Sequence, residues 1–211
     1  AEQFKRVTNI TPVDFVIEGN GASDKKVSQY NIDSGWGIHV TAECTIPETI
    51  IKSVLRTISD KLLSCFYPSK QLAEQDGMVG YNINVANSIA SIFVATGQDL
   101  ASIHESSTGI LHLEKRGDGL YIKLTLPNLV IGSVGGGTSL PKQLEALEIM
   151  KCYGNGKVNR FAKLIAGFAL GLEISTYAAI VSGEFAKAHE KLGRNKPVQW
   201  LLNSEITPDF I

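Results

Sequence analysis

The chain has 211 residues, of which 44% are hydrophobic, so it is long and apolar enough to bury one core as a single domain. Its formal net charge of -1 and its pI near 6.5 argue against a nucleic-acid-binding protein, because such proteins carry a broad excess of lysine and arginine. The odd number and scattered spacing of Cys44, Cys65 and Cys152 favour reduced thiols in a cytoplasmic protein and predict no metal site.

The first half of the chain predicts two strands and two helices. Residues 1–16 are interpreted as a lead-in, with a strand expected around residues 14–18, and residues 20–26 as a polar, turn-rich loop. Alternating β-forming residues at 37–46 predict the next strand. The spacing of apolar residues then predicts helices over 48–66 and 82–96, with a loop at 67–80 between them.

The second half predicts a hairpin followed by helices. Residues 109–114 and 120–126 are expected to pair around Gly117-Asp118-Gly119. A helix is expected from about Pro141, with Thr138 or Ser139 available as its cap, and residues 152–157 form a turn. Two helices, 159–172 and 174–192, complete the chain. Because strands and helices mix without strict alternation, we predict an α+β fold.

Residues 164–183 are apolar over about the length of a bilayer span, and Gly167 and Gly171 have the spacing of a transmembrane helix contact. Glu173 lies near the centre of this segment, however, and a carboxylate there is costly in lipid. We therefore expect a buried pair of helices and no membrane span.

The glycine loop GSVGGGT, residues 132–138, follows a predicted strand and precedes a predicted helix. Consecutive glycines leave the backbone open, and N–H groups at the start of a helix favour an anion such as phosphate. The spacing matches neither the dinucleotide fingerprint nor the phosphate loop, so a tight structural turn is the alternative interpretation.

Three side chains, Lys25, Asp99 and His189, are candidates for acid–base or oxyanion chemistry. A lysine held by a carboxylate can stabilise negative charge on oxygen, and Asp99 could adjust the pKa of such a lysine. His189 could act as a general acid, since the histidine pKa lies near neutrality. Each has an ordinary alternative: an exposed charged turn, a loop residue after a helix, and a cation at a helix C-terminus.

Four motifs are more specific in their order along the chain than any one of them is alone. They are DKK at 24–26, YNINVANSIASIFVATGQD at 81–99, LPNLVIGSVGGGTSLP at 126–141 and EISTYAAIVSGEFAKAHEKLGR at 173–194. Together they resemble the C-terminal part of the catalytic region of the hydroxymethylglutaryl-coenzyme A reductase family, of the type found in eukaryotes and archaea. The resemblance extends from about residue 14 to about residue 196.

The resemblance implies a fold and a reaction. Residues 17–196 would form the substrate-binding large domain of that family and residues 197–211 a tail. Residues 1–16 would be the remnant of a strand that leaves the inserted small cofactor domain, most of which is missing. The implied reaction is the NADPH-dependent reduction of a hydroxymethylglutaryl-coenzyme A thioester, in two hydride transfers, to mevalonate and coenzyme A. A homodimer or higher oligomer is implied as well.

The matched motifs also imply roles for individual residues. Lys25 would stabilise the oxyanion, and Asp99 would tune the proton balance of Lys25. His189 would protonate the departing coenzyme A thiolate. Substrate contacts would come from Lys26 and Lys70, and from Asn87, which would also help to hold the lysine. The dinucleotide would contact the whole glycine loop, namely Gly132, Ser133, Val134, Gly135, Gly136, Gly137 and Thr138.

The sequence also departs from the family pattern. The catalytic glutamate of the family lies in an upstream motif that this sequence lacks, so an upstream segment or companion chain would have to supply it. The run SKQLAEQDGMV at 69–79 is shorter and more charged than in the family, and Lys70 aligns only loosely. Two alternatives therefore stay open. One is a shortened relative repurposed for isomerase, cyclase or lyase chemistry on another carbonyl compound, and the other is a non-catalytic binding or oligomerisation module.

Overall fold

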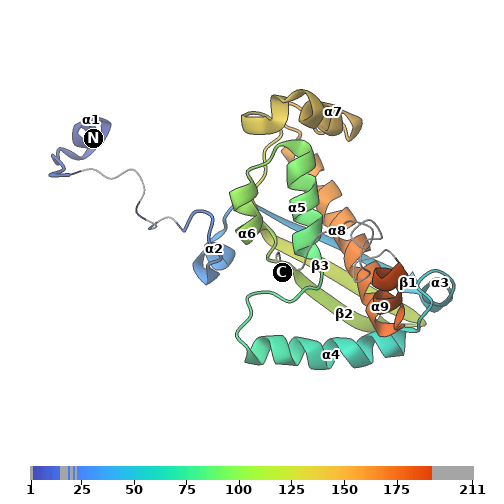
Figure 1. Cartoon of the computed structure of the whole chain (residues 1–211). Coiled ribbons are helices and arrows are strands. Elements are labelled where there is room, and N and C mark those ends of the chain that lie inside the picture. Colours follow the sequence, from blue (N-terminus) through green and yellow to red (C-terminus); the bar gives the residue numbers. More distant parts are fainter. Residues whose placement is uncertain (1, 15–18, 20, 22, 192–211) are drawn as a thin grey trace, which may run out of the picture.

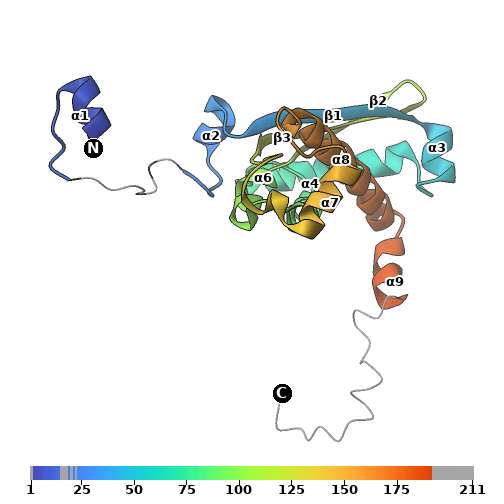
Figure 2. The ribbon, with the colours of Figure 1, turned by 90° about the horizontal axis from the view of Figure 1, so that it is seen from above.

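A computed structural model describes residues 2–14, 19, 21 and 23–191. In this part of the chain, helices cover one face of a small antiparallel sheet (Figures 1 and 2). The sheet has the strand order β1-β3-β2, with β1 at Ile38–Pro47, β2 at Ile110–Arg116 and β3 at Gly119–Leu129. The predicted α+β class is confirmed.

The central strand shows why the sheet packs on one side. Along β3, buried side chains alternate with half-buried ones, as expected for a sheet with a single covered face. The buried set is Leu120, Ile122, Leu124 and Leu126. The predicted hairpin is confirmed, because Arg116 pairs with Gly119 across a two-residue turn in which Gly117 has a φ of 59°. The strand predicted at 37–46 is confirmed by β1.

The longest helix forms the centre of the helical layer. Helix α8 packs against β1, β3 and α5 through a buried stripe that includes Phe161, Ile165 and Ala169. The helices follow one another along the chain in this order: α1 (Glu2–Thr8), α2 (Gln29–Ser34), α3 (Glu48–Ser53), α4 (Ser59–Gln75), α5 (Val85–Thr96), α6 (Ile103–Ser106), α7 (Pro141–Ile149), α8 (Val158–Val181) and α9 (Glu184–Lys191).

The single helix predicted at 48–66 and the loop predicted at 67–80 are wrong. The chain breaks between α3 and α4, where Arg56 has a left-handed φ of 55° and the Glu48 carboxylate accepts a hydrogen bond from the Ser59 N–H. Helix α4 then continues through Pro68 to Gln75. Burial of residues on one side of α4, including Phe66, outweighs the hydrogen bond that proline removes.

The predicted division of the last helices at Glu173 is also wrong, because α8 runs through this residue without a break. Glu173 is fully buried, and its carboxylate accepts hydrogen bonds from the backbone N–H groups of Ile83, at 2.8 Å, and Asn84. These donors lie at the start of α5, where N–H groups lack partners within the helix. Burial raises the pKa of Glu173, and the backbone hydrogen bonds oppose that shift.

Among the described residues, α8 is the one helix that could cross a membrane by length and composition. It packs against the sheet and α5, and it buries the carboxylate of Glu173. The strand expected around residues 14–18 and the tail at 197–211 fall wholly or mainly outside the described residues. The part of the lead-in that is described contains a short helix, α1, with no buried residue.

Replacing Glu173 with alanine should lower the free energy of unfolding by roughly 1–3 kcal/mol, because two buried N–H groups lose their acceptor. Urea denaturation followed by circular dichroism measures the change. Glu148, which is exposed on α7, provides the control, and Glu148→Ala should change stability by less than about 0.5 kcal/mol. Equal midpoints for the two variants would show that the Glu173 contact does not stabilise the fold.

The contribution of Glu173 should also depend on pH in a defined direction. Because the pKa is raised in the folded state, the native protein binds this proton more tightly than the unfolded chain does. The resulting stabilisation is fully present below the ordinary carboxyl pKa of about 4.3 and is lost as pH rises through the raised pKa. Glu173→Gln removes the titration, so wild type should lose stability relative to this variant as pH is raised toward neutrality. Denaturation midpoints over a pH series test this, and a constant difference would contradict it.

Candidate functional site

Lys25 lies between two carboxylates from different parts of the chain. Its Nζ is 3.0 Å from Oδ2 of Asp24 and 3.3 Å from Oδ2 of Asp99. Lys25 precedes α2, whereas Asp99 follows the end of α5. The fold therefore brings together two of the three side chains that the sequence suggested for acid–base chemistry.

The two carboxylates act on Lys25 in the same direction. Hydrogen bonds from the ammonium to Asp24 and then to Asp99 raise the pKa of Lys25, so the amine is held in its charged form. The three side chains are 39–56% exposed, so solvent screens the pair. The backbone of Lys25 has a φ of 57°, a left-handed conformation that is uncommon for a residue with a side chain.

The segment that carries Asp99 touches the glycine loop through the backbone. Gly97 ends α5 with a φ of 68°, and a Cβ atom placed there would lie 2.3 Å from the carbonyl oxygen of Gly137. A Cβ at Gly137 would in turn lie 2.8 Å from the carbonyl oxygen of Gly97. Only glycine at both positions permits this approach, which holds the GQD segment beside the glycine loop.

Gln98 ties the same two segments together, although the sequence did not single it out. Its buried side chain donates a hydrogen bond to the carbonyl of Gly132 at 3.1 Å and accepts one from the Gly132 N–H at 2.7 Å. An amide side chain can pair with both backbone groups of one residue because it has a donor and an acceptor side by side. The sequence signal that could have identified Gln98 is its position between Gly97 and Asp99.

The glycine loop has an open part and a closed part. Gly135 and Gly136 have φ values of 81° and 52°, and no atom lies within 4 Å of a Cβ built at either. Ser133 and Thr138 are buried, and their hydroxyls donate to backbone carbonyls of Gly154 and Gly135. The two ends of the loop are thus structural, while the middle leaves bare backbone accessible.

The expected capping of the next helix by Thr138 or Ser139 is wrong. Gly136–Ser139 forms a 3-10 turn, in which the Thr138 hydroxyl bonds within the loop, and α7 starts only at Pro141 without a side-chain cap. Pro141 does occupy the first turn, as the sequence predicted. Val134 is exposed on the outside of the loop.

Two cavities involve residues near the Lys25 group in space or in sequence. One of about 370 Å³ is lined by Gly97 and Asp99 on one wall and by Gly136 and Gly137 on the other. The second, of about 690 Å³, is lined by Val27, two residues beyond Lys25, and by residues that include Tyr81. Both volumes lie in the range of small-molecule sites.

Of the two lysines suggested for substrate binding, Lys70 lies beside the larger cavity, and Lys26 precedes Val27, which lines it. Lys26 is exposed next to Lys25, and its N–H donates to the carbonyl of Ser23 at 3.2 Å. Lys70 pairs with Glu74 at 3.0 Å and lines a smaller cavity that shares Tyr81 with the larger one. The Lys70 ammonium is therefore engaged locally in this structure.

The remaining candidates lie elsewhere. Asn87 faces a separate groove between α5 and α8, and its amide donates to the side chain of Asn84. His189 lies on α9, which extends away from α2 and α6 in both views (Figures 1 and 2). The His189 ring packs against Phe185, whose carbonyl is 2.8 Å from Nδ1. Within one chain, the fold does not bring His189 to Lys25.

In the described residues, no group of three or more histidine, cysteine or acidic side chains could hold a metal ion.

Comparison with known proteins decides the family. A family model described as hydroxymethylglutaryl-coenzyme A reductase matches residues 2–194. The chain belongs to the hydroxymethylglutaryl-coenzyme A reductase family. Its relatives include 3-hydroxy-3-methylglutaryl-coenzyme A reductases of Methanocaldococcus jannaschii, 38% identical over 179 residues, and Pyrococcus horikoshii, 41% identical over 185 residues. The reductase 2 of Arabidopsis thaliana is 34% identical over 188 residues.

The match covers most of this chain but less than half of each of these reductases. The shares of this chain are 84%, 84% and 85% respectively, and the shares of the three relatives are 44%, 45% and 33%. In this reductase-family chain, the DKK, GQD and glycine-loop motifs are the ones that meet in space.

Removing either carboxylate beside Lys25 should lower the pKa of this lysine toward its ordinary value. The hydrogen bond to Asp24 is the larger cause of the raised pKa, so Asp24→Asn should lower it more than Asp99→Asn. NMR titration of the lysine side chain measures both. Glu145→Gln, which changes an exposed carboxylate on α7, is the control and should leave the Lys25 pKa unchanged. A larger drop for Asp99→Asn than for Asp24→Asn would contradict the assignment.

Gly97→Ala should destabilise the protein by roughly 1–3 kcal/mol, because the new Cβ meets the Gly137 backbone at a residue that is already left-handed. Gly167→Ala is the matched control in the middle of α8. A Cβ there meets nothing within 4 Å, so that change should stabilise the helix by roughly 0.5–1 kcal/mol. Thermal unfolding of both variants tests the contact, and a neutral Gly97→Ala would disprove it.

Proposed function

We propose that this chain supplies the C-terminal catalytic portion of a hydroxymethylglutaryl-coenzyme A reductase, an oxidoreductase of the mevalonate route to isoprenoids. The observation that carries the proposal is the Lys25 ammonium, held by Asp24 and Asp99 beside the contact between Gly97 and the glycine loop. A positioned cation is what reduction of a carbonyl requires, since negative charge develops on the oxygen. The substrate would be a hydroxymethylglutaryl thioester of coenzyme A.

In this proposal Lys25 binds the carbonyl oxygen and stabilises the oxyanion that forms when hydride reaches the carbon. Asp99 holds the ammonium and tunes its proton balance by raising its pKa, which keeps Lys25 charged beside the oxygen. His189 protonates the departing coenzyme A thiolate. Because α9 does not approach Lys25 within one chain, that step requires a neighbouring subunit or the rest of the reductase to bring His189 to the site.

The residues present fit part of a nicotinamide dinucleotide. Gly135 and Gly136 expose backbone that no side chain covers, and the cavity of about 370 Å³ runs from Gly136 and Gly137 to Asp99. When bound, NADPH supplies the hydride for both reduction steps. The glycine loop would hold the dinucleotide, while Lys26 and Lys70 would contact the substrate carboxylate near the larger cavity. A substrate contact by Asn87 stays a prediction, as do the cytoplasmic setting and the homo-oligomer.

We also propose that the chain acts together with an upstream segment or companion chain that provides the catalytic glutamate. Support comes from its length, because it spans less than half of the curated reductases that it matches. The alternative of non-redox acid–base chemistry is not favoured, because the similar proteins from both archaea and a plant are named as reductases.

Reconstitution tests the reductase proposal. The portion of the Methanocaldococcus jannaschii reductase that this chain does not match is produced separately and mixed with the chain. NADPH should then be oxidised only when hydroxymethylglutaryl-coenzyme A is present, because hydride transfer needs the thioester as acceptor. The chain alone should give no turnover. Absorbance of NADPH measures the rate, and turnover at a normal enzyme rate by the isolated chain would refute the requirement for a second segment.

Lys25→Ala should reduce the rate of the reconstituted enzyme by about 10²–10³-fold, the usual effect of removing one oxyanion donor. Lys142→Ala, which removes an exposed ammonium on α7, is the control and should leave the rate unchanged. A Lys25→Ala variant that keeps full activity would remove the basis of the mechanism.

A further inference from the structure

The loop that carries Lys25 needs support from outside itself, because two of its residues have unfavourable backbone angles. Ser23 and Lys25 have φ values of 55° and 57°, in the left-handed region that is costly for a residue with a side chain. The contact of Lys25 with Asp24 is local, since the two are neighbours in the chain. The contact with Asp99 is not, and it forms only if the loop lies at a defined place beside the end of α5.

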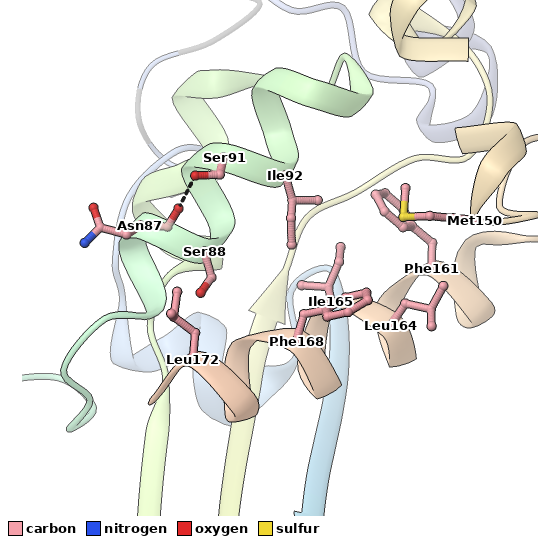
Figure 3. Close-up of a pocket in the computed structure, with 10 residues that line it drawn as sticks. All are labelled: Asn87, Ser88, Ser91, Ile92, Met150, Phe161, Leu164, Ile165, Phe168 and Leu172. Atoms are coloured by element: carbon pink, nitrogen blue, oxygen red, sulfur yellow. Dashed lines mark hydrogen bonds between the residues drawn. The ribbon is translucent and has the colours of Figure 1, made fainter. Parts of the chain in front are cut away.

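Asn87, which the family resemblance assigned to holding the lysine, makes its hydrogen bonds elsewhere in this chain. Figure 3 shows Asn87 on α5, at the edge of the groove between α5 and α8, where its carbonyl accepts a hydrogen bond from the Ser91 hydroxyl at 2.8 Å. Its side-chain amide donates to Asn84. Among the described residues, no hydrogen bond joins Asn87 to Lys25, so other groups fix the loop.

A buried asparagine on α2 contacts the loop. Within α2, all of which the structure describes, Asn31 is the one buried residue and is 3% exposed, whereas its neighbour Tyr30 is 73% exposed. This reverses the usual order, because a buried amide costs free energy unless it forms hydrogen bonds. The Asn31 side chain donates to the carbonyl of Ser23 at 3.4 Å, and the same carbonyl accepts the N–H of Lys26 at 3.2 Å. Asn31 thus holds the start of the turn that contains Lys25.

A second buried asparagine connects Asn31 to the sheet. Asn128 lies near the end of β3 and is 1% exposed. Its amide donates to the backbone carbonyl of Asn31 at 3.2 Å and to that of Pro127 at 3.0 Å. The Asn31 carbonyl also accepts the N–H of Gly35, and one carbonyl can serve two donors because it has two lone pairs. The contacts therefore run from β3 through Asn31 to Ser23.

We propose that Asn31 is a positioning residue for Lys25, which it brings within reach of Asp99 by tying the Ser23 carbonyl to the central strand through Asn128. In the proposed reduction, the Lys25 ammonium needs a fixed place beside the carbonyl oxygen, and Asn31 acts only through that placement. The inference rests on the proposed function for the purpose of the placement. The placement itself can be tested on this chain alone.

A purely structural role for Asn31 makes a different prediction. If Asn31 served only to join α2 to the sheet, its removal would destabilise the protein but leave the surroundings of Lys25 unchanged in the folded state. Both carboxylates raise the pKa of Lys25, and Asp99 supplies the part that depends on tertiary structure. The pKa of Lys25 therefore reports whether the loop is in place.

NMR titration of the Lys25 side chain measures this pKa in the full chain, with Lys25→Arg used to assign the signal. Asn31→Ala should lower the Lys25 pKa by about as much as Asp99→Asn does, because both variants lose the contact with Asp99. Gln29→Ala is the matched control. It removes another amide from α2, one that is exposed and donates to Asp33, and should leave the Lys25 pKa unchanged.

A double-mutant cycle shows whether Asn31 acts through the contact with Asp99. The variant with both Asn31→Ala and Asp99→Asn should have the same Lys25 pKa as Asp99→Asn alone, since the contact can be lost only once. Acetylation by acetic anhydride, followed by mass spectrometry, gives an independent measure. Near the ordinary lysine pKa of about 10.4, Lys25 should react about two- to fivefold faster in Asn31→Ala than in wild type, because more of the amine is uncharged.

Urea denaturation separates this effect from a general loss of stability. Asn31→Ala and Glu48→Ala should both lower the midpoint, since each removes a side chain that is hydrogen-bonded to a backbone group. Only Asn31→Ala should change the Lys25 pKa, because Glu48 lies on α3, beyond the opposite end of β1. If Asn31→Ala does not fold, Asn128→Ala takes its place, because it weakens the same contacts from the strand side and should lower the pKa as well.

Three results would overturn the proposal. They are an unchanged Lys25 pKa in folded Asn31→Ala or Asn128→Ala, additive effects of Asn31→Ala and Asp99→Asn, and an equal shift in Gln29→Ala. The two proposals fail separately. A lowered Lys25 pKa without turnover in the reconstituted enzyme supports the positioning role and refutes the reductase activity, whereas an unchanged pKa in an active enzyme does the reverse.

Discussion

The buried carboxylate of Glu173 sets the position from which the candidate site is built. It accepts hydrogen bonds from the backbone at the start of α5 while its own helix, α8, lies against the sheet. The opposite end of α5 closes at Gly97 against the backbone of Gly137. One helix is thus fixed at both ends, and Asp99 lies two positions beyond Gly97. The contact between Asp99 and Lys25 follows from that placement.

This arrangement gives the glycine-rich segments two distinct tasks. Gly97 and Gly137 are needed because two backbones meet there, so their lack of a side chain is explained by packing alone. Gly135 and Gly136 meet no neighbour and have backbone angles that favour glycine, which leaves this part of the loop free for a ligand. The structural interpretation of the loop is therefore confirmed at Gly137, whereas ligand binding by Gly135 and Gly136 stays a prediction.

Local patterns predicted the hairpin and β1 because turn residues and alternation act over a few positions. They failed at Pro68 and Glu173, where burial in the tertiary structure overrides the local preference, and at Arg56, whose residue type gives no sign of a left-handed conformation. The pairing of Lys25 with Asp99 came from family resemblance, since no spacing rule joins such distant segments. Gln98 was missed because its role is to bridge two backbones, and His189, which the resemblance joined to Lys25, lies on α9 against Phe185 in the described chain.

The left-handed backbone of Lys25 has a practical consequence for engineering. Glycine and asparagine adopt this conformation at lower cost than lysine, so either would relax the main chain while deleting the ammonium. A screen for thermal stability alone would therefore enrich replacements at this position. The selected variants would be more stable but would lack the ammonium between Asp24 and Asp99. If Lys25 has the proposed role, stability and activity make opposite demands on this residue, and a library built on this protein should keep it fixed.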